Sequence, residues 1–293
     1  MSATELVTVR DFVRYSVSRF RAAGLAFGHG TTSAYDEAVF IVLETLHLPI
    51  DQLEPFLDAR LTSDERGRLA HVIEARVSER KPAPYLTGRA YVQGIPFRVD
   101  ERVIVPRSYL GELLFSDLPI FPDADEVENV LDLCTGSGCL AILAAMAFPG
   151  AHVDAVDLSP DALVVARLNV TDHAMSERVA LHEGDLYAPL SHKRYDLILT
   201  NPPYVDADAM ANLPPEYRHE PRLALAGGDD GLDVVRRIIS GAAEHLTERG
   251  GLLCEIGTGR EKLEHEYPDL PFLWLDTAES EGEVFWLEAH HLK

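Results

Sequence analysis

Tyr195-Asp-Leu-Ile-Leu-Thr-Asn-Pro-Pro-Tyr204 is the stretch that decides the fold of this chain. Its apolar run, Leu197–Leu199, predicts a buried parallel strand, and neither a strand nor a helix continues through the two prolines. The loop that follows therefore begins at the C-terminal edge of a strand. Ligands bind at this edge in open α/β sheets, so we expect a functional site here.

The loop has the chemistry of a receptor for a planar NH2 group. Pro202 and Pro203 have no backbone N–H, so the turn offers carbonyl oxygens with few competing donors. Asn201 adds a side-chain oxygen, and Tyr204 adds an aromatic face for stacking. An amide nitrogen is a poor nucleophile, so two acceptors that hold its N–H groups would aim its lone pair at an electrophilic methyl group. The alternative is a plain turn, because Asn-Pro is common in turns.

From Val130 onward the predicted strands alternate with helices, which indicates a doubly wound α/β sheet. The last two predicted strands are too close for a crossover helix, so they should pair antiparallel. Seven strands that end in such a hairpin differ from a plain dinucleotide-binding fold. The expected strands are Val130–Leu133, His152–Val156, Val179–His182, Leu197–Thr200, Leu252–Ile256, Phe272–Leu275 and Val284–Leu287.

Apolar residues at helical spacing predict a small helical domain over residues 1–83. Its third helix is expected to begin at Thr62, where Glu65 stands in capping-box register. The residues that this helix is expected to bury are Leu69, Val72, Ile73 and Val77. A small appended domain of this kind is suited to recognising a macromolecular substrate.

The pattern changes to β-rich residues over Ala90–Gln93 and Phe97–Val105, on either side of Gly-Ile-Pro, which predicts a hairpin. Pro106 predicts the first turn of a helix. Arg107 beside it is a candidate for the wall of a substrate cleft, with simple solvation as the alternative. The chain is therefore divided into a helical N-terminal substrate-recognition domain (1–83), a β-hairpin linker (84–105) and a catalytic domain (106–293).

The loop after the first sheet strand predicts a nucleoside site. Gly136 and Gly138 permit a tight turn and a close approach of the backbone to a ligand. The second strand ends at Asp157, whose carboxylate can accept hydrogen bonds from both ribose hydroxyls. Ala141 stands where a dinucleotide site would have a third glycine, and Asp132 inside the strand suits a cationic ligand instead. The amino and sulfonium groups of S-adenosylmethionine are such cations.

Asp185 and Leu186 follow the third strand and would lie beside the adenine of this cofactor. Each acidic residue also has a simpler interpretation, because Asp157 and Asp185 could serve as a helix N-cap or a turn residue, and Leu186 as part of the core. Taken together, the three residues favour the nucleoside site.

The composition bounds the remaining possibilities. The formal charge is −22, from 48 acidic and 26 basic side chains, which disfavours direct nucleic-acid binding and suits either a basic protein partner or solubility alone. The longest apolar stretch, Cys139–Phe148, is too short to span a bilayer, and no signal peptide is expected. Three cysteines without a CxxC pair indicate reduced, cytoplasmic thiols. The 12 histidines form no metal-ligand pattern, so no metal is expected.

Three motifs, Asp132–Cys139, Asp157–Pro160 and Asn201–Tyr204, resemble those of the class I S-adenosylmethionine-dependent methyltransferases of the HemK group, which modify glutamine side chains at N5. Further segments resemble, more narrowly, the branch of this group that methylates a glutamine of the third protein of the large ribosomal subunit. These segments are Tyr15–Phe20, Gly28–Thr31, Val99–Val103, Val105–Ser108 and Glu216–Pro221. The similarity spans nearly the whole chain.

The resemblance implies a Rossmann-like, seven-stranded methyltransferase sheet preceded by a helical domain and a β-hairpin linker. It also implies S-adenosylmethionine as cofactor, S-adenosylhomocysteine as product, and a glutamine amide held by Asn201 and the Pro202 carbonyl. With the residues above, the expected cofactor-binding set is Asp132, Thr135, Gly136, Ser137, Gly138, Asp157, Asp185, Leu186 and Asn201. The expected substrate-binding set is Asn201, Pro202, Pro203, Tyr204 and Arg107, and the expected catalytic set is Asn201, Pro202 and Tyr204.

Two departures and three alternatives accompany this interpretation. The sister enzymes that modify peptide release factors carry Pro-Arg-Pro where this chain has Ser108 in place of the second proline, which favours the ribosomal substrate. Leu186 stands where an aromatic residue often flanks adenine.

Release factors remain the main alternative substrate. An N6-adenine DNA methyltransferase would need a basic recognition region, and a non-enzymatic adenosyl-binding assembly factor would tolerate the loss of Asn201.

Overall fold

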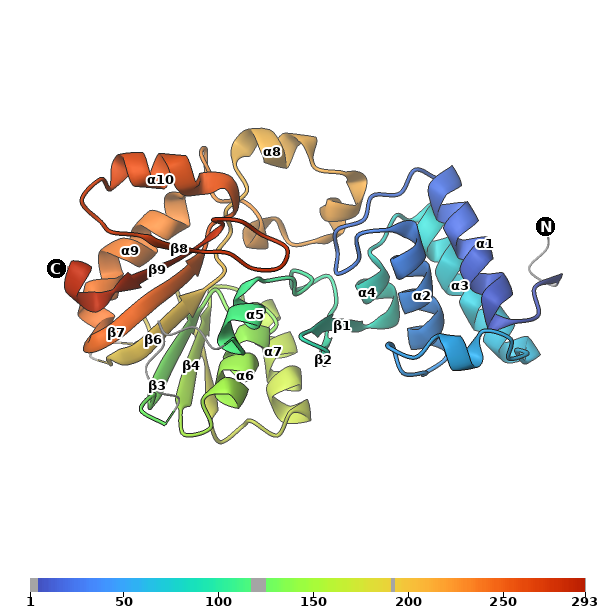
Figure 1. The fold of residues 1–293 in the computed structure, drawn as a ribbon, viewed down its shortest axis with the longest axis horizontal. Coiled ribbons are helices and arrows are strands. Elements are labelled where there is room, and N and C mark those ends of the chain that lie inside the picture. The colour runs from blue at the N-terminus through green and yellow to red at the C-terminus, as the bar shows by residue number, and fades with distance from the viewer. Residues whose placement is uncertain (1–4, 117–124, 191–192, 293) are drawn as a thin grey trace. The chain divides into compact units, whose positions relative to one another are not determined.

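The computed structural model describes residues 5–116, 125–190 and 193–292. These residues form two compact units (Figure 1). Unit 1 draws on Met1–Ala90, Val99–Glu101 and Leu213–His219, and unit 2 on Tyr91–Arg98, Arg102–Asn212 and Glu220–Lys293. The predicted division into domains at 1–83, 84–105 and 106–293 stays a prediction, and its first four residues and its last lie outside the described ranges.

Unit 2 is built on a seven-stranded sheet with the order β5-β4-β3-β6-β7-β9-β8. Strands β3 to β7 pair in parallel, whereas β9 pairs antiparallel with both β7 and β8. The mixed sheet and the antiparallel end confirm the predicted fold class. The strands are β3 (Asn129–Leu133), β4 (His152–Asp157), β5 (Val179–Glu183), β6 (Tyr195–Thr200), β7 (Leu246–Glu255), β8 (Leu273–Leu275) and β9 (Val284–Glu288).

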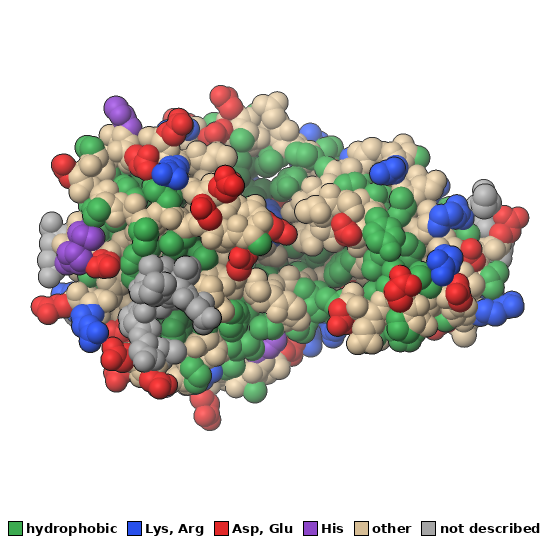
Figure 2. Space-filling model, in the orientation of Figure 1, with side chains coloured by type: hydrophobic (Ala, Val, Ile, Leu, Met, Phe, Trp, Pro, Cys, Tyr) green, Lys and Arg blue, Asp and Glu red, His purple; other side chains and the backbone are tan. Residues whose placement is uncertain are grey.

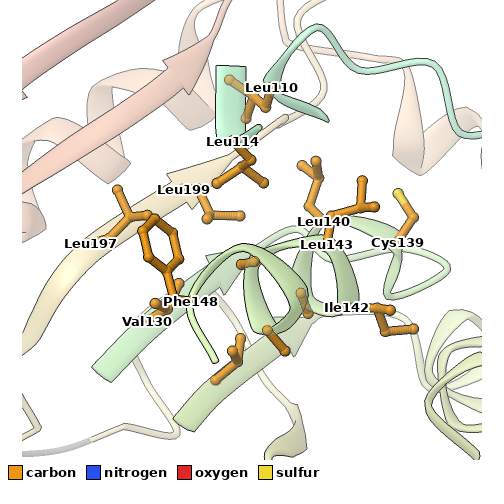
Figure 3. Packing of buried hydrophobic residues seen from close by; sticks show 14 of the residues in the cluster. Leu110, Leu114, Val130, Cys139, Leu140, Ile142, Leu143, Phe148, Leu197 and Leu199 are labelled. Atoms are coloured by element: carbon orange, nitrogen blue, oxygen red, sulfur yellow. The ribbon is translucent and has the colours of Figure 1, made fainter. Parts of the chain in front are cut away.

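Helices cover both faces of this sheet (Figure 1). Because side chains alternate along a strand, Leu197 and Leu199 of β6 enter one core while Ile198 enters the other. Figure 3 shows the first core, where both leucines lie among side chains of α5 and α6. The second core contains side chains of α9. The helices of unit 2 are α5 (Leu110–Leu114), α6 (Cys139–Ala147), α7 (Pro160–Asp172), α8 (Ala207–Asn212), α9 (Asp233–His245) and α10 (Arg260–Glu266).

The hairpin is shorter than predicted. Its strands are β1 (Arg89–Val92) and β2 (Ile95–Arg98), so the prediction of a strand over Phe97–Val105 was wrong. Gln93 and Gly94 both have positive φ, 52° and 72°. Two such residues form the tight hairpin turn whose twist matches that of the strands, and they bring Ile95 into β2.

The helix predicted to begin at Pro106 begins at Leu110 instead. The backbone N–H groups before it are bound by two distant carboxylates. Glu220 accepts a hydrogen bond of 2.9 Å from the N–H of Val105, and Glu255 accepts one of 3.0 Å from the N–H of Tyr109. These long-range contacts hold the segment in an irregular conformation that its sequence alone does not specify.

Unit 1 is a helical bundle with a charged centre. The reciprocal hydrogen bonds between Thr62 and Glu65 confirm the predicted capping box. Leu69 and Ile73 are buried as predicted, whereas Val72 and Val77 are only partly buried. The same helix also buries Arg76 completely, and its guanidinium donates to Glu37. The helices are α1 (Val9–Ala22), α2 (Ala34–Thr45), α3 (Ser63–Ser78) and α4 (Ala83–Thr87).

Short 3-10 turns complete the described structure at Glu54–Phe56, Pro215–His219, Arg222–Ala224, Gly257–Gly259 and Ala289–His291. Asp and Glu side chains are scattered over the face shown in Figure 2, in keeping with the net charge of −22. Among the helices of the described ranges, none combines the length and the apolar character needed to cross a bilayer.

Candidate active site

The carboxyl edge of the parallel strands carries a cavity within unit 2. Its walls come from the loops after β3, β4, β5 and β6, which is the edge where the sequence places a ligand. The predicted site residues in its lining are Gly136, Asp157, Asp185, Leu186, Asn201 and Pro203. The further lining residues are Arg102, Val103, Ile104, Cys134, Val156, Leu158, Ser159, Ala162, Gly184, Pro221, Leu223, Ala224, Val234 and Arg237.

The glycine loop shapes one wall of this cavity. Gly136 and Gly138 have φ of +55° and +79°, values that L side chains rarely adopt. A Cβ at Gly138 would also come within 3.2 Å of Ala166 on α7. Cys134 has φ of +60° although it is not a glycine, and such strain gathers at functional sites. The loop is therefore held in a turn that leaves its backbone open to the cavity at Gly136.

Asp157 presents its carboxylate to the cavity from the end of β4. Its two oxygens accept 2.8 Å hydrogen bonds from the N–H groups of Gly136 and Ser159. Burial raises the pKa of this carboxyl, and the two backbone donors oppose the shift. Each oxygen keeps a lone pair that can accept a ligand hydroxyl. This geometry suits the two hydroxyls of a ribose.

Asp132 is completely buried and does not line the cavity. One of its oxygens, Oδ2, accepts from the Thr135 hydroxyl at 2.5 Å and from the Ala141 N–H at 3.0 Å. In the part of the chain that the structure describes, Oδ1 has no hydrogen-bond partner. Burial raises the pKa of Asp132 to about 7. An orphaned buried acceptor with this pKa fits a carboxyl that gains a cationic partner when a ligand binds.

The rim of the cavity combines one ion pair with apolar side chains. Arg237 of α9 donates to Asp185 at 2.7 Å, with both side chains about half exposed. Leu186 is almost fully buried, whereas Leu158 and Leu223 each expose 53% of their surface. Apolar side chains at the rim of a largely apolar cavity are suited to a flat, partly apolar group such as a purine.

Asn201 and Pro203 reach the same cavity from the end of β6, and Pro202 is buried behind them. Across residues 5–116, 125–190 and 193–292, the Asn201 side chain makes no hydrogen bond. Its amide oxygen is therefore available to a ligand.

Three glycines fix Tyr204 behind the loop. A Cβ at Gly227 would lie 2.7 Å from the Tyr204 Cα, and one at Gly231 would lie 2.4 Å from its carbonyl oxygen. A Cβ at Gly257 would lie 2.8 Å from the Tyr204 ring. Backbone hydrogen bonds of 2.9 Å also join Val205 to the strand-like segment at Leu225 and Gly227. The aromatic ring is thus packed against main chain, and Tyr204 itself does not line the cavity.

The comparisons with known proteins agree with this geometry. Residues 111–213 match the family described as the methyltransferase small domain. A ribosomal protein uL3 glutamine methyltransferase of Bradyrhizobium diazoefficiens is 61% identical over an alignment of 295 positions, which covers 98% of this chain and 92% of that protein. The protein of the same name from Burkholderia pseudomallei is 56% identical over 299 residues, covering 99% and 97%. This chain belongs to the uL3 glutamine methyltransferase family.

Membership of the uL3 glutamine methyltransferase family confirms the resemblance seen in the sequence and makes the chain a methyltransferase. A crystal structure of a methyltransferase from Pyrococcus furiosus shares the fold, with a TM-score of 0.50 at 13% identity over 78% of this chain and 99% of that one. The family and the class I methyltransferase fold imply the use of S-adenosylmethionine.

Arg107 forms an ion pair with the buried carboxylate of Glu220. Its guanidinium forms two hydrogen bonds with Glu220, of 2.6 and 2.8 Å, and Glu220 is almost fully buried. Arg107 does not line the cavity. This bidentate contact favours a structural role for Arg107, which fixes the segment before α5. It does not favour the substrate contact that was expected from the sequence.

The cavity also shows what the sequence analysis missed. Thr135, Ser137 and Gly138 shape the glycine loop without lining the cavity, whereas Cys134 lines it. Arg102–Ile104 and Pro221–Ala224 lie far from the motifs along the chain, and no local pattern marks them. Leu158 carried a usable signal, because an apolar residue directly after the ribose-type Asp157 is out of place in a solvated turn.

One group of possible metal ligands lies at the C-terminal end of β9. Ligand atoms of Glu288, His290 and His291 lie within 4.8 Å of one another, and all three side chains are exposed. No metal was expected from the sequence. Exposed groups of this kind occur commonly without an ion, so we assign no function to them.

Proposed function

We propose that this enzyme transfers a methyl group from S-adenosylmethionine to the side-chain amide nitrogen, N5, of a glutamine in ribosomal protein uL3, the third protein of the large subunit. The observation that carries the proposal is the Asn201–Tyr204 loop at the edge of an acid-lined cavity, in a chain 61% identical to a protein named for this activity. The cytoplasm, where ribosomes are assembled and work, is the corresponding location.

The residues of the cavity fit the cofactor. When bound, S-adenosylmethionine supplies an electrophilic methyl group on a sulfonium and leaves as S-adenosylhomocysteine. Asp157 would accept the ribose hydroxyls, and the orphaned Oδ1 of Asp132 would serve the cationic amino end. Leu186 and the ion-paired Asp185 would flank the adenine. Gly136 would let the backbone approach the cofactor, while Thr135, Ser137 and Gly138 would hold the loop in shape.

The Asn201–Tyr204 loop would hold the substrate amide. The side-chain oxygen of Asn201 and the carbonyl oxygen of Pro202 would accept the two N–H groups of the glutamine and direct its lone pair into the cavity. Positive charge develops on this nitrogen during transfer, so the two acceptors stabilise the transition state more than the ground state. The nitrogen becomes acidic once it is methylated, and its proton can pass to water without a strong base.

Two features support a ribosomal protein as the substrate. A protein that binds ribosomal RNA must neutralise phosphates with Lys and Arg, and a chain with a net charge of −22 attracts such a partner. The helical unit 1, which includes the predicted recognition domain, is the candidate for this contact. A peptide release factor is the second candidate substrate, and Ser108 argues against it because the release-factor enzymes have proline there.

The test incubates the purified protein with methyl-labelled S-adenosylmethionine and unmethylated uL3, a release factor or duplex DNA, and locates the label by mass spectrometry. We expect one methyl group on a uL3 glutamine. Label on the release factor alone would transfer the chain to the sister activity, and label on DNA would contradict glutamine chemistry. Cofactor binding without any labelled product would favour a non-enzymatic binding protein.

A variant of the loop tests the mechanism. Asn201→Ala removes one of the two acceptors, and we expect kcat to fall about 100- to 1,000-fold, as for the loss of one preorganised contact to a developing charge. Cofactor affinity should change little. Asn212→Ala, on the exposed helix α8, is the matched control and should leave kcat unchanged. Wild-type turnover by Asn201→Ala would contradict the acceptor mechanism.

A further inference from the structure

Glu255 is a buried acid for which the chemistry above has no use. It ends β7 and exposes 1% of its surface. Its Oε2 accepts hydrogen bonds from the Ser108 hydroxyl at 2.7 Å and from the Tyr109 N–H at 3.0 Å. Its Oε1 accepts one from the Tyr204 hydroxyl at 3.0 Å. All three donors are neutral, and burial raises the pKa of the carboxyl to about 7.

Packing alone does not account for a carboxyl at this position. A buried carboxyl without a basic partner destabilises the fold, and an apolar side chain would fill the same volume without that penalty. The neighbouring residues of β7 are indeed apolar and fully buried, as Leu252 and Leu253 show. Within residues 5–116, 125–190 and 193–292, three hydrogen bonds are what offsets this cost, and one of them is to a residue of the candidate active site.

Tyr204 is the residue that Glu255 can control. The main chain of Tyr204 is confined by Gly227 and Gly231, and one side of its ring faces Gly257. The hydroxyl at the far end of the ring is held by Glu255. The ring is therefore fixed at both ends, and Asn201 and the Pro202 carbonyl lie within three residues of it along a rigid Pro-Pro segment.

We propose that Glu255 is a positioning residue for methyl transfer, acting through the Tyr204 hydroxyl to hold the Asn201–Tyr204 loop in its acceptor geometry, with Ser108 orienting the carboxylate. The inference rests on the proposed function and extends it. It also gives Ser108 a physical role, because a proline at this position has no hydroxyl and could not donate to Glu255. The chain Ser108–Glu255–Tyr204 thus joins the segment before α5 to the substrate loop.

The isosteric variant Glu255→Gln changes the polarity of this chain. An amide must keep its oxygen toward the Ser108 hydroxyl and the Tyr109 N–H, which are both donors, so its NH2 group faces the Tyr204 oxygen. The strong contact from the tyrosine hydroxyl to a carboxylate is then lost. Tyr204→Phe removes the same contact from the other side. Each variant should lower kcat about 10- to 100-fold, the range for a hydrogen bond to a charged group.

The experiment is a double-mutant cycle, which measures whether two residues act through each other. The turnover of uL3 is measured for the wild type, Glu255→Gln, Tyr204→Phe and the double variant. If Glu255 acts through the tyrosine hydroxyl, the double variant should be no slower than the slower single variant. The KM for S-adenosylmethionine should stay within about twofold, because neither residue lines the cavity. Glu248→Gln, exposed on the same strand β7, is the matched control with wild-type kcat.

The proposal would be overturned if the fold-loss in kcat of the double variant equalled the product of the two single losses. It would also be overturned if Glu255→Gln kept the wild-type kcat. Should Glu255→Gln fail to fold, Ser108→Ala keeps the carboxylate and removes one of its three donors. Its loss of kcat, about 3- to 10-fold for one neutral hydrogen bond, should vanish in the Tyr204→Phe background, and its persistence there would refute the chain. If the wild-type enzyme does not methylate uL3, the proposed function is contradicted rather than the role of Glu255. The double-mutant cycle is then measured with the substrate that the wild type does methylate.

Discussion

The charged side chains that expose no more than 1% of their surface have different partners in the two units, although Glu220 of unit 2, which exposes 5%, is paired with Arg107. In unit 1 the completely buried Arg76 donates to Glu37 at 2.7 Å, and Glu216 lies 3.7 Å from the same guanidinium. Among the described residues of unit 2, the completely buried Asp132 and the almost fully buried Glu255 receive only neutral donors. Paired buried charges are expected of a structural core, whereas acids buried without a base are destabilising and call for a function.

The difference separates stability from activity. In unit 1 the charges compensate one another, so the centre of the unit depends on every member being present. In unit 2 the burial of Asp132 and Glu255 raises both pKa values to about 7. Burying these carboxyls near the active site therefore reduces the unfolding free energy of the protein at neutral pH. Substitution of Arg76 in unit 1 should therefore act on folding, whereas substitution of Asp132 or Glu255 in unit 2 should act on catalysis, cofactor binding or pH dependence.

The largest effect is expected for Arg76→Ala. The substitution leaves Glu37 buried without its partner, and breaking a buried pair in this way costs about 3–5 kcal/mol of unfolding free energy. Urea denaturation followed by circular dichroism measures this loss. Arg14→Ala, an exposed arginine on α1, should change the unfolding free energy by less than about 0.5 kcal/mol. Equal stability of the two variants would remove the distinction between the units.

The second prediction concerns Asp132 and the pH dependence of stability without cofactor. Its pKa is raised from 3.8 to about 7, so the folded protein keeps a proton that the unfolded chain releases. The resulting stabilisation is fully present below about pH 4 and is lost as pH rises towards 7, by about 4 kcal/mol at about 1.4 kcal/mol per pKa unit. Asp132→Asn does not titrate, so the wild type should lose stability relative to this variant over that range.

The measurement is urea denaturation of both proteins at several pH values between 4 and 8. Glu255 titrates over a similar range in both proteins, so its contribution cancels in the difference. A difference that stays constant with pH would show that Asp132 is ionised in the folded protein throughout, and the contrast with the paired charges of unit 1 would then rest on Glu255 alone.

The sheet, and the position of the Asn201–Tyr204 loop at its carboxyl edge, could be predicted from sequence because their signals are local. Apolar runs such as Leu197–Leu199 end at residues that stop a strand, and the Pro-Pro pair marks the carboxyl edge without reference to any other part of the chain. The glycines of the first loop and Asp157 at the end of the next strand carry the same kind of signal.

The missed features depend on partners that are distant along the chain. Ser108 and Glu255 are 147 residues apart, and Arg107 and Glu220 are 113 apart. Glu255 also helps to explain why the helix predicted at Pro106 begins at Leu110, because it binds the Tyr109 N–H that such a helix would donate to the Val105 carbonyl. The burial of Arg76 could not be predicted, since nothing within one helix reveals that Glu37 is buried opposite it.

A smaller effect than for Arg76 or Asp132 is expected for Asp157→Asn, which tests an acid that is buried only in part and faces the cavity. Both of its oxygens accept backbone N–H groups, so an amide would place one NH2 against a donor and lose one acceptor for the cofactor. We expect the Kd for S-adenosylmethionine, measured by calorimetry, to rise about 10- to 100-fold. Asp161→Asn, exposed in the first turn of α7, should bind like the wild type. Because Asp157 is proposed to hold the cofactor rather than the loop, kcat at saturating cofactor should change less than in Glu255→Gln. A larger loss of kcat than of affinity would contradict a ribose contact by Asp157.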